Sequence, residues 1–451
     1  MALKKRTERQ YASADRNLLV KDSNIWNGEG FTRGSVLIEN GKIKRIARRI
    51  DAPGVKIINA SGLCALPGMI DVHVHLRDMR LSYKEDFASG TAAAAAGGFT
   101  TVLDMPNTVP PTDSVERLIE KQSRAARKVR VNVGFHAAAT PDRRVIGGLA
   151  EAGAFSLKLY MPKPIASFDV TDDAEIQKMM VGAARARIPV TVHAEEMKPS
   201  GKKEPVDDIQ KLAKARPPII ETRAVHRIAS IQRGTGCRVH FCHLTLASSL
   251  GEVRAGSPRT TSEVTPHHIL LSTKLLNKLG WKAWMVPPLR SESNRRALLS
   301  AIHAGYCDIV ASDHAPHAIG EKILPPEDSP PGVPGLETTL PLMLTLVDKG
   351  ILNFSLLTRM MAESPARIFG LGSKAKLRPG YDGDLALIDR KKKLRIDSSR
   401  FLSKAKYSPF DGFPTTGGVV STIVGGTLVY DHGELWGKEG SGAILRGSFS
   451  E

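Results

Sequence analysis

The regular alternation of two hydrophobic patterns restricts the fold of this chain more than any other feature. Short β-like runs occur at residues 69–75, 99–105, 129–136, 155–160, 189–193, 238–243, 260–265 and 307–313. Helix-like segments or long loops follow them, for example SVERLIEKQSRAARK after the second run. Eight strand–helix units over about 250 residues predict an α/β fold of the (β/α)8 TIM-barrel type. A doubly wound sheet also alternates, but no GxGxxG motif follows the first run.

The segments on both sides of this region have a different, β-rich pattern. Residues 17–47 contain short strand-like runs with ENGK as a hairpin signal, and residues 380–396 and 417–435 resemble them. We therefore expect the two ends of the chain to form one small β-sandwich. The expected domains are 1–66 and 373–451 for the two parts of the sandwich, the latter with the tail, and 67–372 for the barrel.

The charge of the chain is strongly basic, with a formal net charge of +18 at pH 7. Basic chains can bind nucleic acid. However, apart from LKKR at residues 3–6 and DRKKKLR at 389–395 the basic residues are scattered, and aromatic residues make up only 5%. We expect attraction for small acidic substrates or an acidic protein partner. A nucleic-acid-binding protein is the remote alternative.

No segment of the sequence predicts insertion into a membrane or export. No run of 18 apolar residues is present, and the first 16 residues predict a loose basic arm rather than a secretory signal. The four cysteines show no CxxC pairing and are too sparse for a disulfide framework. These features predict a cytoplasmic protein.

The stretch IDVHVHLRD at residues 70–78 places two histidines on one face of the first predicted strand. His73 and His75 would lie about 6.5–7 Å apart along that strand, close enough to bind one metal ion. A lone HxH pair is more often half-exposed at a sheet edge. Here His193, His243 and Asp313 end three further predicted strands. These ends form the barrel rim where active sites are built, so the set predicts a metal site.

Lys158 in AFSLKLYMP is unusual for a predicted barrel strand. Leu157 and Leu159 share one face, so a lysine between them would point into the barrel if the leucines face the helices. A buried, unpaired ammonium is costly. Carboxylation by CO₂ would convert it into an anion able to bridge two metals. Alternatively, Lys158 reaches the rim or pairs with an acid, and the residues leave both possibilities open.

In this order the motifs resemble the binuclear amidohydrolase superfamily and, within it, dihydroorotases of the long type that is fused into the animal pyrimidine multienzyme. The resemblance covers nearly the whole chain after about residue 17. It rests on DVHVHLRD, KEDFASGTAAAAAGGFTTVLDMPNT, SLKLYMP, VHAEE, CHLT, EVTPHH, ASDHAPH, GVPGLETTLPL and SKAKYSPFDGFPTTGGVVSTIVGG.

This resemblance implies two zinc ions and a reversible, zinc-dependent reaction. L-dihydroorotate would be hydrolysed to N-carbamoyl-L-aspartate or formed from it, as in pyrimidine (UMP) biosynthesis. His73 and His75 would bind one ion and His193 and His243 the other, with carboxylated Lys158 between them. Asp313 would complete the first site and act as the catalytic residue, accepting a proton from the nucleophile and passing it to the leaving nitrogen.

The resemblance also implies which residues bind the substrate. Arg77 would hold the ring carboxylate with a bidentate fork. Asn107 and His317 would add further carboxylate contacts, and Pro331 and Gly332 would contribute backbone contacts. Without the resemblance, Arg77 would be interpreted as a rim salt bridge and Asn107 as a helix cap.

The chain departs from the family pattern at two places. HLRDMR stands where many relatives have HLREPG, which puts the geometry of the following loop in doubt. Val286 stands where relatives often have Asn before PPLR, so one substrate contact is expected to be absent.

Three alternatives and two further expectations remain. Allantoinases and hydantoinases share the metal-binding residues, but Arg77 and YKEDF favour a dihydroorotase. A catalytically inactive scaffold would have lost metal ligands, whereas all of them are present here. The resemblance also implies a homo-oligomer and a possible complex with aspartate transcarbamoylase.

Overall fold

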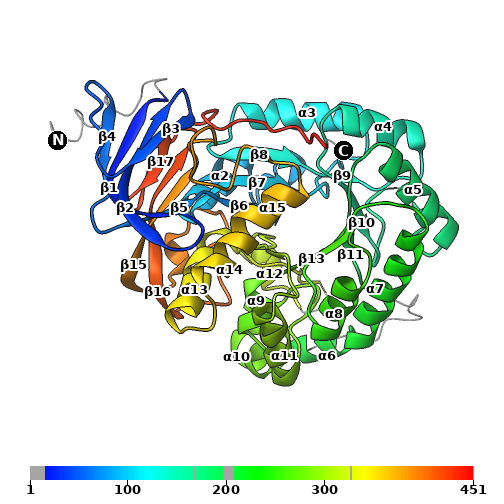
Figure 1. Cartoon of the computed structure of the whole chain (residues 1–451). Coiled ribbons are helices and arrows are strands. Elements are labelled where there is room, and N and C mark those ends of the chain that lie inside the picture. Colours follow the sequence, from blue (N-terminus) through cyan, green and yellow to red (C-terminus); the bar gives the residue numbers. More distant parts are fainter. Residues whose placement is uncertain (1–15, 167, 197–207, 326–327, 450–451) are drawn as a thin grey trace.

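A computed structural model describes residues 16–166, 168–196, 208–325 and 328–449. The predicted basic arm lies almost wholly outside the described residues. The chain forms a barrel of strands surrounded by helices, with a separate sheet packed against one side (Figure 1).

The barrel is built from parallel strands, as the alternation predicts. Each predicted run contains one of them, generally shorter than expected, and β9 continues β8 after His136. The strands are β6 (Met69–Val74), β7 (Phe99–Asp104), β8 (Asn132–Phe135), β9 (Ala137–Ala138), β10 (Leu157–Tyr160), β11 (Val190–His193), β12 (Val239–Phe241), β13 (Thr260–Val264) and β14 (Ile309–Val310). A parallel bridge between Val74 and His314 joins the last strand to the first. The (β/α)8 barrel is confirmed.

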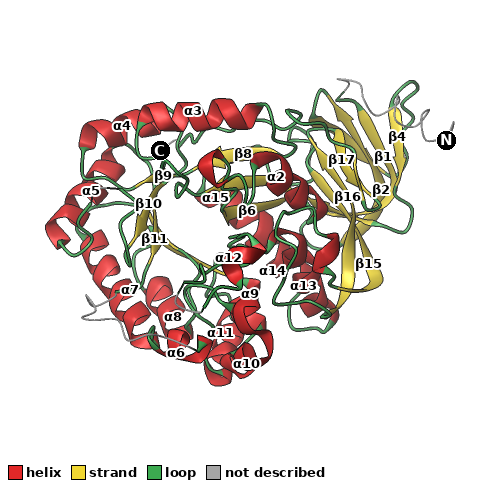
Figure 2. Cartoon of the chain, turned by 180° about the vertical axis from the view of Figure 1, so that it is seen from behind, coloured by secondary structure: helices red, strands yellow, loops and turns green. Residues whose placement is uncertain are grey.

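Helices surround the barrel strands on the outside (Figure 2). Each of the first three long ones begins at a side chain that accepts a backbone N–H, as helix caps do: Asp86, Ser114 and Asp142. The longer helices are α2 (Phe87–Ala96), α3 (Val115–Ala126), α4 (Arg143–Glu151), α5 (Asp173–Arg185), α7 (Pro218–Arg233), α8 (Ala247–Ala255), α11 (Glu292–His303) and α13 (Leu336–Asp348). The shorter ones are α6 (Ile209–Lys214), α9 (Pro266–Leu270), α10 (Leu276–Leu279), α12 (Ile319–Lys322), α14 (Phe354–Thr358) and α15 (Ser364–Ile368).

The two ends of the chain meet in one nine-stranded sheet, which confirms the second predicted unit. Its strands are β1 (Leu18–Trp26), β2 (Phe31–Glu39), β3 (Lys42–Ala47), β4 (Lys56–Asn59), β5 (Cys64–Pro67), β15 (Leu385–Arg395), β16 (Pro414–Val424), β17 (Thr427–Asp431) and β18 (Glu434–Leu435). Strand β5 pairs antiparallel with β15, for example Leu66 with Ala386. The division of the chain at residues 66 and 372 stays a prediction.

Residues 396–413, between β15 and β16, leave the sheet and pack against the barrel; we call them the C-terminal strap. Glu337 of α13 accepts the backbone N–H groups of Leu402 and Ser403. Tyr407 is fully buried, with its ring centroid 5.3 Å from that of Trp281. The strap therefore reaches the loops at the carboxyl ends of the barrel strands.

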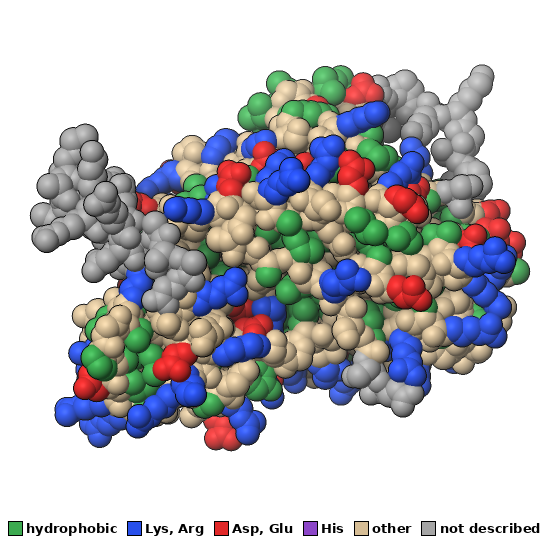
Figure 3. Space-filling model, turned by 90° about the horizontal axis from the view of Figure 1, so that it is seen from above, with side chains coloured by type: hydrophobic (Ala, Val, Ile, Leu, Met, Phe, Trp, Pro, Cys, Tyr) green, Lys and Arg blue, Asp and Glu red, His purple; other side chains and the backbone are tan. Residues whose placement is uncertain are grey.

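The surface and the cysteines are consistent with the composition. Figure 3 shows Lys and Arg side chains interspersed with Asp and Glu rather than gathered in one patch on the face seen there. The four cysteines, Cys64, Cys237, Cys242 and Cys307, are buried and free. Among the described residues, no helix has the length and apolar character that crossing a membrane requires.

Candidate active site

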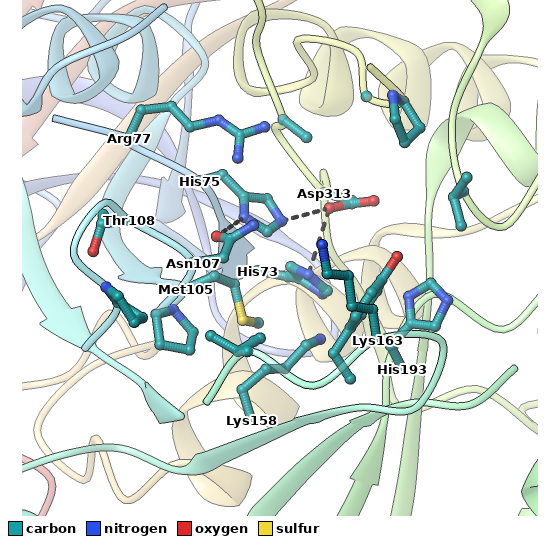
Figure 4. A pocket seen from close by; sticks show the side chains of 18 of the residues that line it. His73, His75, Arg77, Met105, Asn107, Thr108, Lys158, Lys163, His193 and Asp313 are labelled. Atoms are coloured by element: carbon teal, nitrogen blue, oxygen red, sulfur yellow. Dashed lines mark hydrogen bonds and ion pairs between the residues drawn. The ribbon is translucent and has the colours of Figure 1, made fainter. Parts of the chain in front are cut away.

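One cavity of about 390 Å³ opens at the carboxyl ends of the barrel strands. Every predicted site residue lines it: His73, His75, Arg77, Asn107, Lys158, His193, His243, Asp313, His317, Pro331 and Gly332. Figure 4 shows Arg77 and Lys158 on opposite sides of the imidazoles of His73 and His75. Strands distant in sequence therefore converge on one site, as the barrel topology requires.

The first group of possible metal ligands consists of His73, His75 and Asp313. Their ligand atoms lie within 4.8 Å of one another. Oδ1 of Asp313 is 3.4 Å from Nε2 of His73 and 3.2 Å from Nε2 of His75. The backbone φ of Asp313 is 45°, a strained value for a residue with a Cβ and one that is common at functional sites.

The second group consists of His193, at the end of β11, and His243, just after β12. Nδ1 of His193 lies 3.0 Å from Nε2 of His243, and both rings are buried. Nε2 of His193 is 2.7 Å from Glu195, which in turn accepts a hydrogen bond of 2.8 Å from Arg216. This chain of contacts fixes the ring of His193 with Nδ1 toward the cavity.

Lys158 points into the barrel from β10, between the outward-facing Leu157 and Leu159. Its side chain is 96% buried, and Nζ contacts Sγ of Cys242 at 3.0 Å. Among the described residues, no carboxylate lies within ion-pair distance of Nζ. Of the alternatives to carboxylation, pairing of Lys158 with an acid is therefore not what the described residues show.

Two acids that sequence reasoning did not single out hold the ligand side chains. Glu263 contacts Nδ1 of His73, accepts the backbone N–H of His243 at 3.2 Å and lies 3.0 Å from Nε2 of His240. Glu195 supports His193 as described above. The alternation in TTSEV, which turns Glu263 inward along β13, was a signal that could have identified it.

Burial and neighbouring charges shift the pKa values of the histidines in the cavity. Burial lowers the pKa of His75 and that of His193 to about 4, so each ring keeps a free lone pair at neutral pH. For His73, burial and the charge of Lys158 lower the pKa. The carboxylates of Glu263 and Asp313 outweigh them and raise the pKa to about 10. Neutral imidazoles together with the carboxylate of Asp313 form a donor set that zinc prefers.

Arg77 and His317 form the side of the cavity where substrate selection was predicted. Arg77 is 94% buried; its Nε donates to the carbonyl of Pro316 at 3.2 Å, and Nη2 lies 3.2 Å from Nε2 of His317. Asn107 contacts Nδ1 of His75 at 2.7 Å. In this arrangement Asn107 orients a possible metal ligand and lines the cavity at the same time.

The loop after HLR, which has no Pro-Gly pair, contains three successive residues with positive φ. Arg77, Asp78 and Met79 have φ values of 58°, 45° and 51°. The carboxylate of Asp78 accepts from the backbone N–H of Phe87 at 3.1 Å and from Lys128 at 2.8 Å, and so stabilises this strained backbone.

Several cavity-lining residues were not predicted as contacts. Tyr160, Lys163 and Ile165 follow Lys158 in the chain. Val286 also lines the cavity and offers no polar group there. His267 and His268 are buried beside each other. His268 contacts Thr265 and the carbonyl of Pro287.

A buried ion pair supports the strand ends that carry this site. Nζ of Lys121 lies 2.6 Å from Asp104, and both side chains are almost wholly buried. Asp104 also accepts the backbone N–H of Leu76, between the two metal-site histidines and Arg77. Replacing Lys121 with methionine is expected to lower the free energy of unfolding by about 3–5 kcal/mol, because Asp104 is left unpaired.

Denaturant unfolding measures this loss. Arg124→Met on the same helix is the matched control: its pair with Glu120 is exposed, and less than about 1 kcal/mol is expected. Equal effects of the two substitutions would contradict the assignment of Lys121.

The sequence matches a family model and many characterised proteins. Residues 64–429 match the model of the Amidohydrolase family. The chain is 42% identical over 418 residues to a dihydroorotase of Methanothermobacter thermautotrophicus, covering 90% of this chain and 93% of that protein. It is 34% identical to a dihydroorotase of Bacillus cytotoxicus, covering 92% and 98%.

Solved structures of hydantoinases resemble the chain in fold. An L-hydantoinase (dihydropyrimidinase) of Arthrobacter aurescens superposes with a TM-score of 0.89 at 30% identity, covering 95% of this chain and 99% of that one. A D-hydantoinase superposes with a TM-score of 0.88 at 25% identity, covering 96% and 100%.

Proposed function

The chain belongs to the amidohydrolase family and to the dihydroorotases within it, and we propose that it interconverts L-dihydroorotate and N-carbamoyl-L-aspartate in pyrimidine biosynthesis. The observation that carries this proposal is the position of Arg77, a buried guanidinium facing the same cavity as the cluster of His73, His75 and Asp313. A cyclic amide bearing a carboxylate has groups that match both.

We propose that the metals are two zinc ions and that Lys158 is carboxylated. His73, His75 and Asp313 would hold the first ion, and His193 and His243 the second. Carboxylation of Lys158 would remove a buried, unpaired cation and supply an anion to both. Such metals polarise a scissile carbonyl and make water a stronger acid, so that amide hydrolysis proceeds at neutral pH.

Asp313 would move the proton during the reaction. Burial alone would raise the pKa of Asp313, but His73 and His75 hold it well below its usual value, so the carboxylate is ionised and can accept a proton. It would take this proton from the attacking water and deliver it to the ring nitrogen as the C–N bond breaks. In the biosynthetic direction the same carboxylate would take the proton from that nitrogen.

The other residues would bind and orient the substrate. Arg77 and His317 would hold its carboxylate, and Asn107 would add a contact while orienting His75. The backbone at Pro331 and Gly332 would contact the ring. Because Nε2 of His317 already lies 3.0 Å from the carbonyl of Pro331, this loop and the carboxylate contact would be arranged together.

Hydrolysis of a hydantoin ring is the second candidate, favoured by the likeness to the L-hydantoinase structure. Hydantoin itself has no carboxylate for Arg77. A buried guanidinium without that partner would be an unsatisfied charge in the complex, which favours the carboxylated ring.

The cellular setting follows from the proposed reaction. We propose that the protein acts in the cytoplasm as a homo-oligomer, and that it binds aspartate transcarbamoylase, whose product is N-carbamoyl-L-aspartate. Failure of the two to co-purify at low salt would count against the complex.

Turnover of L-dihydroorotate beside allantoin and hydantoin, with zinc and bicarbonate supplied, tests the function. We expect turnover of dihydroorotate alone, removed by chelation and restored by zinc. In Arg77→Ala, kcat/KM is expected to fall about a hundredfold with metal content unchanged, because a buried charged partner of the carboxylate is lost. Turnover of another ring, with none of dihydroorotate, would reject the substrate but keep the metal site.

A further inference from the structure

The ring of His317 is fixed by contacts outside the cavity as well as inside it. Its backbone N–H donates to the hydroxyl of Tyr407 at 3.2 Å. Nδ1 lies 3.1 Å from Nζ of Lys84, and Nε2 lies 3.0 Å from the carbonyl oxygen of Pro331. The ring therefore has a partner at each nitrogen, and the two partners differ in kind.

These partners determine where the proton of the neutral ring resides. An ammonium can only donate a hydrogen bond and a carbonyl can only accept one. Nδ1 must therefore be the acceptor from Lys84, and Nε2 must carry the hydrogen that it donates to Pro331. The opposite tautomer would place Nδ1–H against the ammonium. Oε2 of Glu321, the nearest carboxylate to Nδ1 among the described residues, is 4.0 Å away, beyond hydrogen-bonding distance.

The charges around His317 keep the ring neutral. Burial, followed by the charges of Arg77, Lys84 and Lys322, lowers its pKa far below the ordinary value. In a neutral ring only one nitrogen can donate. The tautomer therefore decides whether Nε2 presents an N–H donor or a lone pair to the cavity.

The selected tautomer places two donors at one point of the cavity. Nη2 of Arg77 lies 3.2 Å from Nε2 of His317, and with Nε2 protonated neither atom can accept from the other. Two adjacent N–H groups without a mutual bond are suited to one anionic oxygen or to the two oxygens of a carboxylate. The substrate oxygen would then replace the carbonyl of Pro331 as the acceptor at Nε2.

We infer that Lys84 is a positioning residue for substrate recognition: it sets the tautomer of His317 so that Nε2–H and Arg77 together grip the substrate carboxylate. This inference rests on the proposed function for the identity of the substrate. Lys84 does not line the cavity and would act only through His317.

Lys84 is itself held in place by a second layer of contacts. Oε1 of Glu321, on α12, lies 3.0 Å from Nζ of Lys84 and accepts a hydrogen bond of 2.8 Å from the hydroxyl of Tyr83. Glu321 balances the ammonium charge and keeps it beside Nδ1. Lys84 belongs to the YKEDF motif, whose lysine had no assigned role in the sequence.

Lys84→Met and Lys84→Arg test the inference in the zinc-loaded, full-length protein. Methionine fills the same space without a donor. We expect its KM for dihydroorotate to rise about tenfold while kcat changes less than about threefold, because a charge-assisted contact to the binding group is lost. Arginine can donate to Nδ1 and is expected to recover most of the loss. Lys42→Met, which loses an ion pair with Asp382 outside the cavity, is the matched control with an unchanged KM.

Imidazole ¹⁵N NMR provides a readout independent of turnover, with His317→Gln to assign the signals. We expect an unprotonated Nδ1 and a protonated Nε2 in the unsubstituted protein, and a mixture of tautomers in Lys84→Met. A protonated Nδ1 in the unsubstituted protein, or an unchanged KM in Lys84→Met, would overturn the inference. Absence of dihydroorotate turnover in the unsubstituted protein would instead reject the proposed function, while the NMR signals would still test Lys84.

Discussion

Replacing Lys158 with alanine is expected to reduce kcat by at least about a thousandfold and to lower the metal content of the purified protein. The side chain is the one predicted ligand that approaches the cavity from β10, between the first and second groups of histidines. Without the proposed anion there, the two proposed metals would lose a shared ligand, and several kcal/mol of charge stabilisation in the transition state would be lost.

Small carboxylates should restore part of the lost activity of Lys158→Ala. Acetate or propionate can occupy the space that the truncated side chain leaves and supply the missing anion. Lys163→Ala, a lysine of the same cavity on the following loop, is the control and is expected to keep its full metal content. Full metal content and activity in Lys158→Ala would rule out the bridging role of that lysine.

Asp313→Asn is expected to lower kcat by about a thousandfold while KM stays within about threefold, since general acid–base groups contribute roughly 10²–10⁴ in rate. Asparagine occupies the same space, but its amide cannot take a proton from water and return it to the ring nitrogen. Because Asp313 also belongs to the first metal group, metal content is measured beside the kinetics.

Asp308→Asn is the matched control for this substitution. Asp308 lies near the opposite end of the same barrel strand and accepts the backbone N–H of Ser262 at 2.9 Å, outside the cavity. Its kcat is expected to remain within about twofold. A kcat equally preserved in Asp313→Asn would show that another group transfers the proton.

Most of the fold could be predicted from hydrophobic periodicity, because the hydrophobic residues of barrel strands and of the outer helices repeat at different intervals. The HxH pair, Lys158 and Asp313 could be placed because alternation fixes which side chains face inward, and the ends of parallel strands share one rim. The pairing of β5 with β15 could be expected only in general terms. Nothing local in either segment specifies the register of Leu66 with Ala386.

The supporting contacts were much harder to predict from the sequence. Alternation along β13 turns Glu263 inward, but no local pattern specifies that its partner is His73, 190 residues away in the chain. Likewise, the contact between Lys84 and His317 joins two loops, and the first of them contains positive φ values at Arg77, Asp78 and Met79. Individual side-chain partners of this kind emerge only when the loops have been placed.

The C-terminal strap has a consequence for how the protein is made. Tyr407 contacts both His317 and the carbonyl of Gly332, so two residues of the cavity wall depend on a segment near the end of the chain. On the ribosome, the barrel strands emerge before the C-terminal strap, and chains begin to fold from the N-terminal side. The nascent barrel therefore lacks the anchor of its substrate loop until the C-terminal strap has also been synthesised, and this wall of the site is completed after the barrel strands.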